Sequence, residues 1–330
     1  MDSFEGKIAV VTGGGTGMGR ELCLQLVREG CNIATCDVLM ENLEETKTLC
    51  QEINSDILVT LHQCDVSSEE AMNHFRDEVV AAHGDKINLL FNNAGIGGGG
   101  SFMNPEDRAD WERTFNVCWF GVYYGCRAFI DTLVNADEGH IVNTSSINGF
   151  WASLGPNTPH TAYCSAKFAV KGFSEALVTD LRMNAPHVGV SVVMPGHIGT
   201  SIAINSGKVL GRPAALDMSE EDIKDIRERM MKSGGEMSEV VMNLSDDQIR
   251  EFMHQRGIAF RDNAPTSAGD AASIILDGVK AGKWRILVGE DAHRLDERVR
   301  ANPESAYEAS FIEAAREGGD LAELIGATEQ

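Results

Sequence analysis

The stretch "VVTGGGTGMGRELCLQL" (residues 10–26) decides the fold, because an apolar run ends in a glycine-rich turn that leads into an amphipathic segment. Its glycines follow the spacing Gly13-x-x-x-Gly17-x-Gly19, not the more common Gly-x-Gly-x-x-Gly. Glycines permit a tight turn and a close approach of the backbone to a pyrophosphate, and the free N–H groups of a helix N-terminus bind the anion. The stretch therefore predicts a dinucleotide site between a strand and a helix.

The next apolar run ends at Asp37, 18 residues past Gly19. An acidic side chain at this place binds the adenosine ribose hydroxyls. A 2′-phosphate ~4 Å from its carboxylate would be repelled by roughly 1 kcal/mol per charge in water and by about 4 kcal/mol at an intermediate dielectric. No Arg or Lys stands beside it, at positions 14, 15, 36 or 38, to offset this repulsion. We expect NAD as the cofactor in preference to NADP.

Apolar runs alternate with amphipathic segments such as 18–30 and 69–84. Strands that are covered on both faces are almost continuously apolar, and strand–helix alternation is typical of a parallel sheet. We therefore expect an α/β protein with a doubly wound, seven-stranded parallel sheet, the Rossmann fold. The expected strands are 7–12, 32–38, 57–66, 87–95, 140–146, 189–196 and 284–289.

The pattern changes after Thr200. Residues 205–263 are polar and Met-rich, with two predicted helices at 219–232 and 245–256 that open with Ser and acidic residues. A further helix is expected within 264–283, with a proline near its start. We predict one α/β domain over 1–290 that includes a helical flap at about 205–263, followed by an acidic, helical C-terminal extension over 291–330.

Composition narrows the function. The 330 residues carry a formal net charge of −22, which argues against nucleic acid or an anionic membrane surface as a partner. No apolar run reaches the roughly 18 residues of a membrane span, and the N-terminus does not resemble a signal peptide. The eight cysteines contain no Cys-x-x-Cys and are expected to be reduced core residues of a cytoplasmic protein. No metal site is expected.

The stretch "TAYCSAK" (161–167) sets Tyr163 four residues before Lys167, on one face of a helix. A tyrosine hydroxyl titrates near 10, so a base that works near neutral pH needs its pKa lowered by about three units, or about 4 kcal/mol. An ammonium ~5 Å away supplies roughly 3 kcal/mol at an effective dielectric of 20. The pair is therefore predicted to be an acid/base pair.

Several short motifs together resemble the short-chain dehydrogenase/reductase family in its single-domain form. The resemblance covers about residues 5–205 strongly and 264–290 weakly. It implies hydride transfer between NAD and a secondary alcohol or ketone in a homodimer or homotetramer. The motifs are "TGGGTGMG" (12–19), "CDV" (64–66), "NNAG" (92–95), "NV" (116–117), "SS" (145–146), "YCSAK" (163–167) and "PGHIGT" (195–200).

The resemblance also implies residue roles. Tyr163 would be the general acid/base and Lys167 its partner, while Ser146 would bind the substrate oxygen and Ser145 would be structural. Asn116 would hold a water that links Lys167 to solvent. The implied cofactor contacts are Gly13, Gly17, Met18 and Gly19 in the turn, Asp37 at the ribose, Asp65 and Val66 at the adenine, Asn93 and Gly95 at the ribose, and Pro195, Gly196, Ile198, Thr200, Tyr163 and Lys167 near the nicotinamide.

Two segments depart from the family pattern. Ser146 and Tyr163 are further apart than is usual, with the extra residues in "GFWASLGPNTPHTA" (149–162). Phe150, Trp151 and Leu154 either line an apolar substrate pocket or pack beneath this loop. The glycine run "GIGGGG" (95–100) predicts a mobile loop at the pocket rim or a plain connector.

The Met-rich flap suits a bulky apolar substrate with an alicyclic, terpenoid, steroid-like or aryl framework. The flap is alternatively a subunit interface. Two other functional classes stay open: an NAD-binding sensor with vestigial catalysis, and a sugar-nucleotide epimerase or dehydratase. The glycine spacing of residues 13–19 argues against the epimerase class, and the intact Ser/Tyr/Lys set argues against the sensor.

Overall fold

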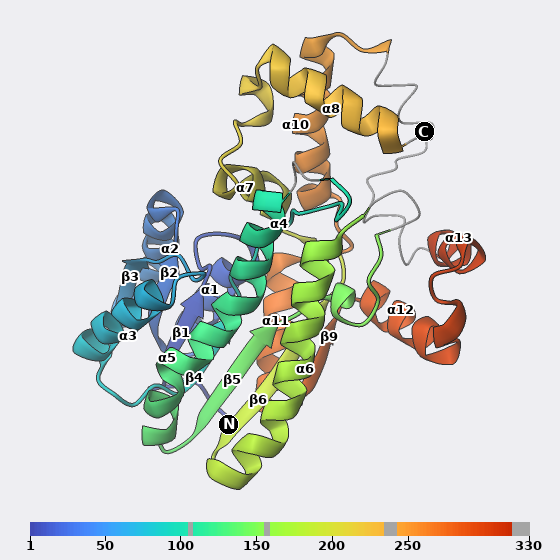
Figure 1. Cartoon of the computed structure of the whole chain (residues 1–330). Helices are drawn as coiled ribbons and strands as arrows, with labels where there is room; N and C mark the ends of the chain where they lie inside the picture. The colour runs from blue at the N-terminus through green and yellow to red at the C-terminus, as the bar shows by residue number, and fades with distance from the viewer. Residues whose placement is uncertain (105–107, 155–158, 234–242, 319–330) are drawn as a thin grey trace.

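A twisted sheet of seven parallel strands forms the centre of the molecule (Figure 1). The computed structural model describes residues 1–104, 108–154, 159–233 and 243–318. The strand order is β3-β2-β1-β4-β5-β6-β9, and all six pairings are parallel. The predicted fold class is confirmed. The strands are β1 (Ile8–Thr12), β2 (Asn32–Asp37), β3 (Val59–Gln63), β4 (Leu89–Asn92), β5 (Gly139–Thr144), β6 (Val188–Pro195) and β9 (Arg285–Val288).

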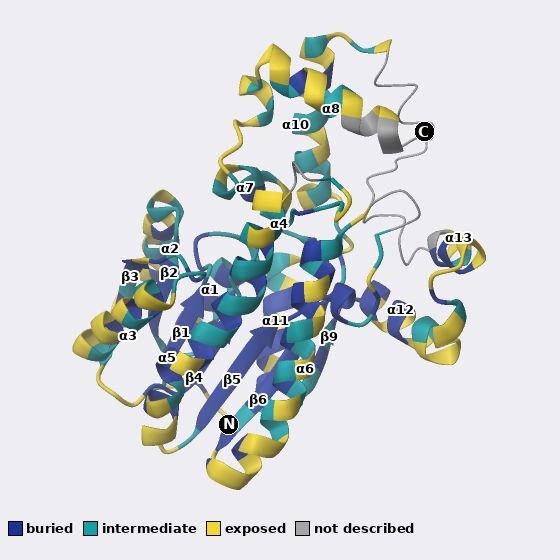
Figure 2. Ribbon diagram, in the orientation of Figure 1, coloured by how far each residue is buried: buried dark blue, intermediate teal, exposed yellow. Residues whose placement is uncertain are grey.

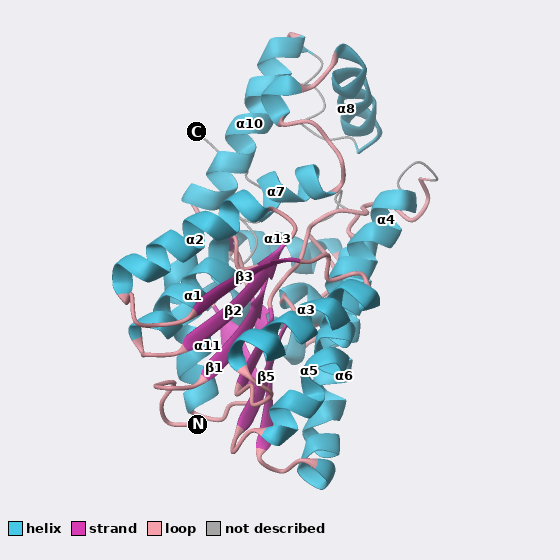
Figure 3. Cartoon of the chain, turned by 90° about the vertical axis from the view of Figure 1, so that its left-hand side faces the viewer, coloured by secondary structure: helices cyan, strands magenta, loops and turns pink. Residues whose placement is uncertain are grey.

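Helices cover both faces of the sheet (Figure 3). Consecutive strand residues point to opposite faces, and both faces are apolar: Val10 belongs to the core under one helix layer and Val11 to the core under the other. This explains the continuously apolar strands. One layer holds α1 (Gly17–Arg28), α2 (Met40–Ile53) and α11 (Ala268–Lys280), and the other holds α3 (Glu69–His83), α5 (Gly121–Asn135) and α6 (Thr161–Asn184).

The chain leaves the centre of the sheet in two directions. Strand β1 pairs with β2 on one side and with β4 on the other. In doubly wound sheets a crevice opens at this reversal, beyond the carboxyl ends of the strands. The fold thus places the turn after β1, the end of β2 and the segment after β4 around one crevice.

Local capping explains several helix ends. The Ser68 side chain accepts a hydrogen bond from the Ala71 N–H at the start of α3, and Gly84, with φ of 86°, ends the helix as predicted. The predicted proline start of the later helix is wrong. Helix α11 begins at Ala268, and its cap is Ser267, whose hydroxyl accepts from the backbone of the third helical residue.

Short elements at the edge of the crevice were not predicted. A π-helical turn (Asn116–Phe120) joins α4 (Arg108–Phe115) to α5. Two-residue strands β7 (Ile198–Gly199) and β8 (Thr266–Ser267) pair in parallel. Strands β3 and β4 are also shorter than the predicted 57–66 and 87–95, because the chain leaves the sheet at their carboxyl ends to form the crevice.

The predicted flap rises beyond the carboxyl end of the sheet (Figure 1). It contains α7 (Ile202–Val209), a 3₁₀ turn (Ala215–Asp217), α8 (Glu220–Ser233) and α10 (Asp246–Asp262), so both predicted helices are present. Ser245 and Gln248 form a capping box at the start of α10. Helices α8 and α10 share a small core around Ile223 and Ile249, and the outer side of α8 is exposed (Figure 2).

The C-terminal segment packs on the loop that follows β5. It forms α12 (Glu290–Ala301), a 3₁₀ turn (Pro303–Ser305) and α13 (Ala309–Glu317), while residues 319–330 of the predicted extension lie outside the described range. Trp151 is fully buried against this segment, and its Nε1 donates to the Ala306 carbonyl at 2.7 Å. Phe150 packs against the same cluster. Of the two roles considered for these aromatic residues, packing is the observed one.

All eight cysteines are buried and free. Among the described helices, none combines the length and the apolar character that crossing a bilayer requires. Within the same residues, no group of three or more His, Cys, Asp or Glu side chains has the arrangement of a metal site.

The buried His140 predicts how stability depends on pH. Burial lowers its pKa to about 4, and its Nε2 lies 2.7 Å from the Ser191 hydroxyl on the neighbouring strand. The unfolded chain takes up this proton at higher pH than the folded chain, so the free energy of unfolding should fall as the pH drops from about 6.5 to about 4. The loss from His140 alone is at most about 3 kcal/mol.

Urea unfolding of the wild type and of His140→Gln, at pH 7.5 and at pH 4.5, tests this expectation. The variant keeps a hydrogen-bonding group but does not titrate, so its stability should depend less steeply on pH. Equal pH dependence in the two proteins would contradict the assignment.

Candidate active site

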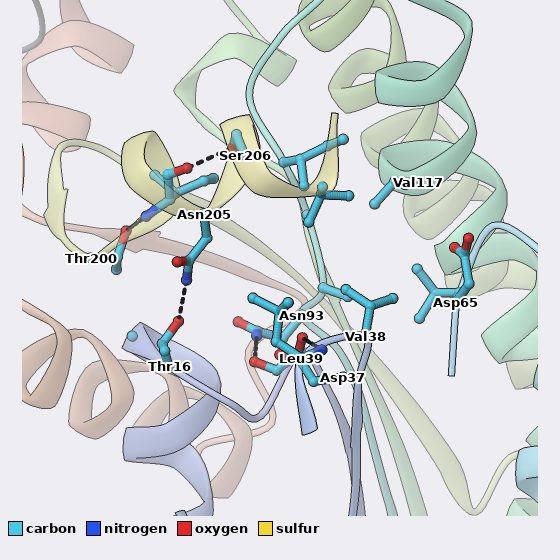
Figure 4. A pocket seen from close by; sticks show the side chains of 18 of the residues that line it. Thr16, Asp37, Val38, Leu39, Asp65, Asn93, Val117, Thr200, Asn205 and Ser206 are labelled. Atoms are coloured by element: carbon cyan, nitrogen blue, oxygen red, sulfur yellow. Dashed lines mark hydrogen bonds between the residues drawn. The ribbon is translucent and has the colours of Figure 1, made fainter. Parts of the chain in front are cut away.

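A cavity of about 140 Å³ occupies the crevice at the carboxyl ends of β1 to β4 (Figure 4). Its walls come from the glycine turn, the ends of β2 and β3, the segment after β4 and the flap helix α7. The fold brings nine of the predicted cofactor residues together here. They are Gly13, Gly17, Met18, Asp37, Asp65, Val66, Asn93, Gly95 and Thr200.

The glycine turn leaves donors free at the start of α1. Gly13 has φ of 68°, and a Cβ atom there would lie 2.8 Å from the Ala94 Cα, so only glycine fits. Thr16 is the N-cap of α1, but its side chain accepts no capping hydrogen bond. The first N–H groups of the helix therefore remain available for an anion.

Gly19 lies behind the turn and does not line this cavity. A Cβ atom there would collide with the Gly13 carbonyl and lie 2.7 Å from Asn93 Nδ2. Asn93 Nδ2 donates to the carbonyls of Thr12 and Gly13 at 3.1 and 3.3 Å. Gly19 thus allows the helix to pack closely on the turn, and its contact with a cofactor stays a prediction.

Asp37 lies at the cavity wall with its carboxylate held by the backbone. It accepts hydrogen bonds from the N–H groups of Gly15 and Leu39, both at 3.1 Å. Burial raises its pKa above the usual value, while these hydrogen bonds oppose the shift. Arg20 lies behind the turn, where it donates to the Gly15 carbonyl and pairs with Glu45 at 2.6 Å.

The far end of the cavity carries an ion pair that the sequence did not indicate. Arg113 of α4 binds Asp65 at 2.8 Å and also lines the cavity. Ser67 donates to the same carboxylate. Although partial burial raises the pKa of Asp65, the hydrogen bonds from Ser67 and Arg113 prevail, and the carboxyl pKa lies below its usual value.

A second, larger cavity of about 320 Å³ adjoins the first. The two cavities share six wall residues: Met18, Asn93, Gly95, Thr200, Ile202 and Ser206. Six further predicted residues meet in this second cavity. They are Ser146, Tyr163, Lys167, Pro195, Gly196 and Ile198.

Tyr163 and Lys167 lie one turn apart on α6, as predicted. The Lys167 ammonium is 5.3 Å from the centre of the Tyr163 ring and donates to the Thr144 carbonyl at 2.8 Å. Gly95 lies beside this ammonium, and a Cβ atom there would be in ordinary van der Waals contact with Lys167 Nζ, at 3.6 Å. The β5 end and α6 thus hold the lysine beneath the tyrosine.

Burial dominates the titration of both groups. It raises the pKa of the Tyr163 phenol well above its usual value, and the nearby Cys118 thiol adds to the shift, whereas a hydrogen bond with Ser146 opposes it. Burial likewise lowers the pKa of Lys167. The lowered tyrosine pKa that we expected from Lys167 is therefore not found for the chain alone.

The two serines after β5 differ in their surroundings. The Ser145 hydroxyl donates to the Lys167 carbonyl at 2.7 Å and so ties α6 to the sheet. The Ser146 hydroxyl accepts from the Asn148 N–H at 3.1 Å and faces the cavity beside Tyr163. Asn116 begins the π-helical turn and lines neither cavity, so its water-holding role stays a prediction.

The end of the glycine run at 95–100 packs against two helices. The carbonyls of Gly99 and Gly100 accept hydrogen bonds from the backbone at the start of α6. A Cβ atom at Gly99, where φ is 61°, would lie 2.7 Å from the Trp111 Cα. These glycines allow close packing between α4 and α6, and the mobility of the run stays a prediction.

The flap helix α7 lies across both cavities. Asn205 Nδ2 donates to the Thr16 hydroxyl at 3.1 Å (Figure 4). The Gly97 N–H donates to the Ser206 hydroxyl at 2.8 Å. These bonds tie the flap to the glycine turn on one side and to the segment after β4 on the other. Sequence alone gave no signal for either contact.

The apolar lining of the second cavity differs from the predicted Met-rich cover. Met218 and Met253 pack in the small core between α8 and α10, away from the cavity. The flap contributes Ile202 and Ala203 from α7 and Phe260 from the end of α10, and the loop after β5 contributes Leu154. Of Phe150, Trp151 and Leu154, only Leu154 lines this cavity.

The sequence of residues 7–210 matches the model of the family described as short chain dehydrogenase. This chain belongs to that family. The arrangement above, with a glycine turn leading to a Ser/Tyr/Lys cluster, is therefore that of a short-chain dehydrogenase, and the chain is an oxidoreductase of this family.

Relatives of known sequence cover most of the chain. SadH of Mycobacterium tuberculosis is 33% identical over 296 residues, which are 90% of this chain and 91% of that protein. Human epidermal retinol dehydrogenase 2 is 31% identical over 216 residues, which are 65% of this chain and 67% of that protein.

Solved structures of the family contain either nicotinamide cofactor. A short-chain dehydrogenase/reductase from Burkholderia phymatum, in complex with NAD, is 29% identical with a TM-score of 0.71 and covers 92% of this chain and 95% of its own. A metagenomic short-chain oxidoreductase in complex with NADP is 31% identical with a TM-score of 0.51 and covers 58% of this chain and 83% of its own.

Proposed function

We propose that this short-chain dehydrogenase interconverts a secondary alcohol and a ketone on a bulky apolar framework, with NAD as cofactor and Tyr163 as general acid/base. The observation that carries the proposal is a pair of adjacent cavities that share wall residues. One presents free helix N–H groups and Asp37, and the other presents Ser146, Tyr163 and Lys167.

The residues of the first cavity fit a dinucleotide. The start of α1 would hold the pyrophosphate, the Asp37 carboxylate the adenosine ribose, and the segment from Asn93 to Gly95 the second ribose. When bound, the nicotinamide accepts or donates the hydride.

The chain's own groups manage the proton. In alcohol oxidation, Tyr163 takes the proton from the substrate hydroxyl, and Ser146 donates a hydrogen bond to the oxygen as charge develops on it. The Lys167 ammonium, 5.3 Å from the ring, stabilises the phenolate that must exist before the step. Burial raises the pKa of Tyr163, so the phenolate would form only when positive charge beside the ring offsets this shift.

The preference for NAD rests on Asp37. Its carboxylate faces the cavity and is held there by two backbone N–H groups, and Arg20 is already engaged by Gly15 and Glu45 behind the turn. A ribose phosphate beside Asp37 would meet the negative charge of that carboxylate. Among the described lining residues the one cationic side chain is Arg113, and it is paired with Asp65.

Replacing Asp37 with Asn should weaken this preference. We expect the ratio of kcat/KM for NAD over NADP to fall roughly ten- to hundred-fold, because the repulsion of the 2′-phosphate is removed. Asp65→Asn removes the same charge from the same cavity near the adenine and is the matched control. A ratio that is equal in wild type and Asp37→Asn, or a wild type that prefers NADP, would refute the role of Asp37.

Substrate size follows from the second cavity. A volume of about 320 Å³ and a lining of Ile147, Leu154, Ile198, Ile202 and Phe260 suit a ring system better than a short polyol. The flap supplies three wall residues of this cavity, Ile202, Ala203 and Phe260. We therefore favour its role as a substrate cover. A subunit interface built from α8 is compatible with that role.

The remaining expectations are proposals of the same kind. We propose a cytoplasmic homodimer or homotetramer whose catalytic domain spans 1–290, with the segment from 291 onward as an extension. Size-exclusion chromatography with light scattering measures the oligomeric state. The alternatives of an NAD sensor and an epimerase predict cofactor binding without net cofactor turnover.

The direct test follows the absorbance of reduced cofactor while NAD, and then NADP, is offered with a panel of cyclic and aryl secondary alcohols. Net reduction of NAD supports the proposal. Binding of NADH with no turnover of any alcohol or ketone in the panel would favour the sensor.

A further inference from the structure

His160 stands in the substrate cavity beside the proposed catalytic tyrosine. It is the residue before α6, and its ring stacks on Tyr163 with the ring centres 4.7 Å apart and an angle of 28° between the planes. His160 is also one of the residues that line the second cavity. Nothing in the proton transfer described above uses it.

The other large polar side chains of this cavity are engaged. Asn148 donates to the carbonyls of Trp151 and Ser153, and Asn93 donates to the glycine turn. The Ser206 hydroxyl is satisfied by Gly97 and by its own helix.

His160 differs from these side chains. In the part of the chain that the structure describes, neither nitrogen of its ring takes part in a hydrogen bond. Both ring nitrogens also remain accessible, since neither belongs to the described polar atoms that are fully buried without a partner. The ring therefore keeps one donor and one acceptor available to a molecule in the cavity.

The charge of the cavity restricts that molecule. Lys167 is the one ionised side chain among the described lining residues, and it is committed to the Thr144 carbonyl beneath Tyr163. Burial lowers the pKa of His160 to about 4, so its imidazole is neutral at physiological pH. A carboxylate or phosphate on the substrate would have no free cation to meet near His160.

We propose that His160 is a specificity-determining residue that binds a second, uncharged oxygen of the substrate, a hydroxyl or a carbonyl, close to the reacting carbon. The substrate class is then a hydroxyketone, diketone or diol on an apolar ring framework. This inference rests on the proposed function, because it names the substrate of the same cavity.

The alternative is that His160 has only a structural role and supports the Tyr163 ring by stacking on it. The two roles separate in His160→Phe, which keeps an aromatic ring for stacking but loses both nitrogens, and in His160→Gln, which loses the ring but keeps a donor and an acceptor. If the ring alone matters, Phe replaces His fully; if the nitrogens matter, Gln retains part of the selectivity.

Acetophenones that carry either a hydroxyl or a methyl group on the ring are matched in size and serve as the probes, with ortho, meta and para isomers of each. Calorimetry measures their binding to the complex of the enzyme with NADH, and the absorbance of NADH follows their reduction. In the wild type the best hydroxyl isomer should bind about five- to tenfold more tightly than its methyl counterpart, as one neutral hydrogen bond provides.

In His160→Phe this ratio should fall to about one, and in His160→Gln it should fall only in part. A ratio of about one in the wild type for every isomer, or a preserved ratio in His160→Phe, would overturn the proposal. A ratio that depends on His160 without any ketone reduction would refute the dehydrogenase function and leave the binding role standing. Ketone reduction together with a hydroxyl-to-methyl binding ratio that does not depend on His160 would support the dehydrogenase function and refute the binding role of His160.

Discussion

Tyr163→Phe should lower kcat for alcohol oxidation about a thousand-fold while NADH binding is retained. General acid/base catalysis by a positioned side chain contributes roughly 10² to 10⁴ in rate. The substitution removes the hydroxyl that takes the substrate proton but keeps the ring that stacks on His160, and it leaves Ser146 and Lys167 in place. The measurement is steady-state cofactor reduction, together with fluorescence titration of NADH.

The pH profile adds a second readout. Oxidation requires the phenolate, so the wild-type rate should rise with pH up to the apparent pKa of Tyr163 in the complex with NAD and substrate, whereas the residual rate of Tyr163→Phe should lack this rise. Tyr123→Phe, the same chemical change on α5 outside both cavities, is the control. A variant at Tyr163 with wild-type activity would show that another group moves the proton.

Gly19→Ala should have the largest effect on the cofactor half of the molecule. The added methyl group would strike the Gly13 carbonyl and crowd Asn93 Nδ2, the donor that holds the glycine turn. Overpacking of this kind costs roughly 1–3 kcal/mol, and a displaced Asn93 amide adds about 1 kcal/mol. We expect the free energy of unfolding to fall by about 2–4 kcal/mol and NADH affinity to fall with it.

Gly172→Ala is the matched control, since Gly172 is also a helical glycine but has no atom within 4 Å of the position where a Cβ would lie. This change should be neutral or stabilising by up to about 1 kcal/mol, because alanine favours the helix. Urea denaturation measures both variants. If Gly19→Ala and Gly172→Ala had the same stability, the close packing behind the turn would not be what Gly19 provides.

The parallel sheet was predictable because its signal is local. Runs such as 7–12 and 189–196 are almost continuously apolar, which is typical of strands that are covered on both faces. The glycine turn, Asp37 and the Tyr163–Lys167 pair were predictable for the same reason, since each joins a chemistry to a short spacing in the sequence.

Contacts between distant segments left no such signal. From the sequence, Trp151 could line the pocket or pack beneath its loop, because its partner Ala306 lies 155 residues away in the chain. The link between Asn205 and Thr16 spans 189 residues. His160 showed no feature in the sequence beyond its place before Tyr163, and its free nitrogens appear only when the cavity walls are assembled.

The central claim is that hydride passes between a secondary alcohol and NAD at Tyr163. It is tested most directly by incubating the enzyme with NAD and a cyclic secondary alcohol that carries deuterium on the carbinol carbon, and by mass spectrometry of the cofactor. The account predicts one deuterium in each reduced cofactor, an equal amount of ketone, and almost none of either product with Tyr163→Phe. Reduced cofactor without deuterium, or equal transfer by Tyr163→Phe, would contradict it.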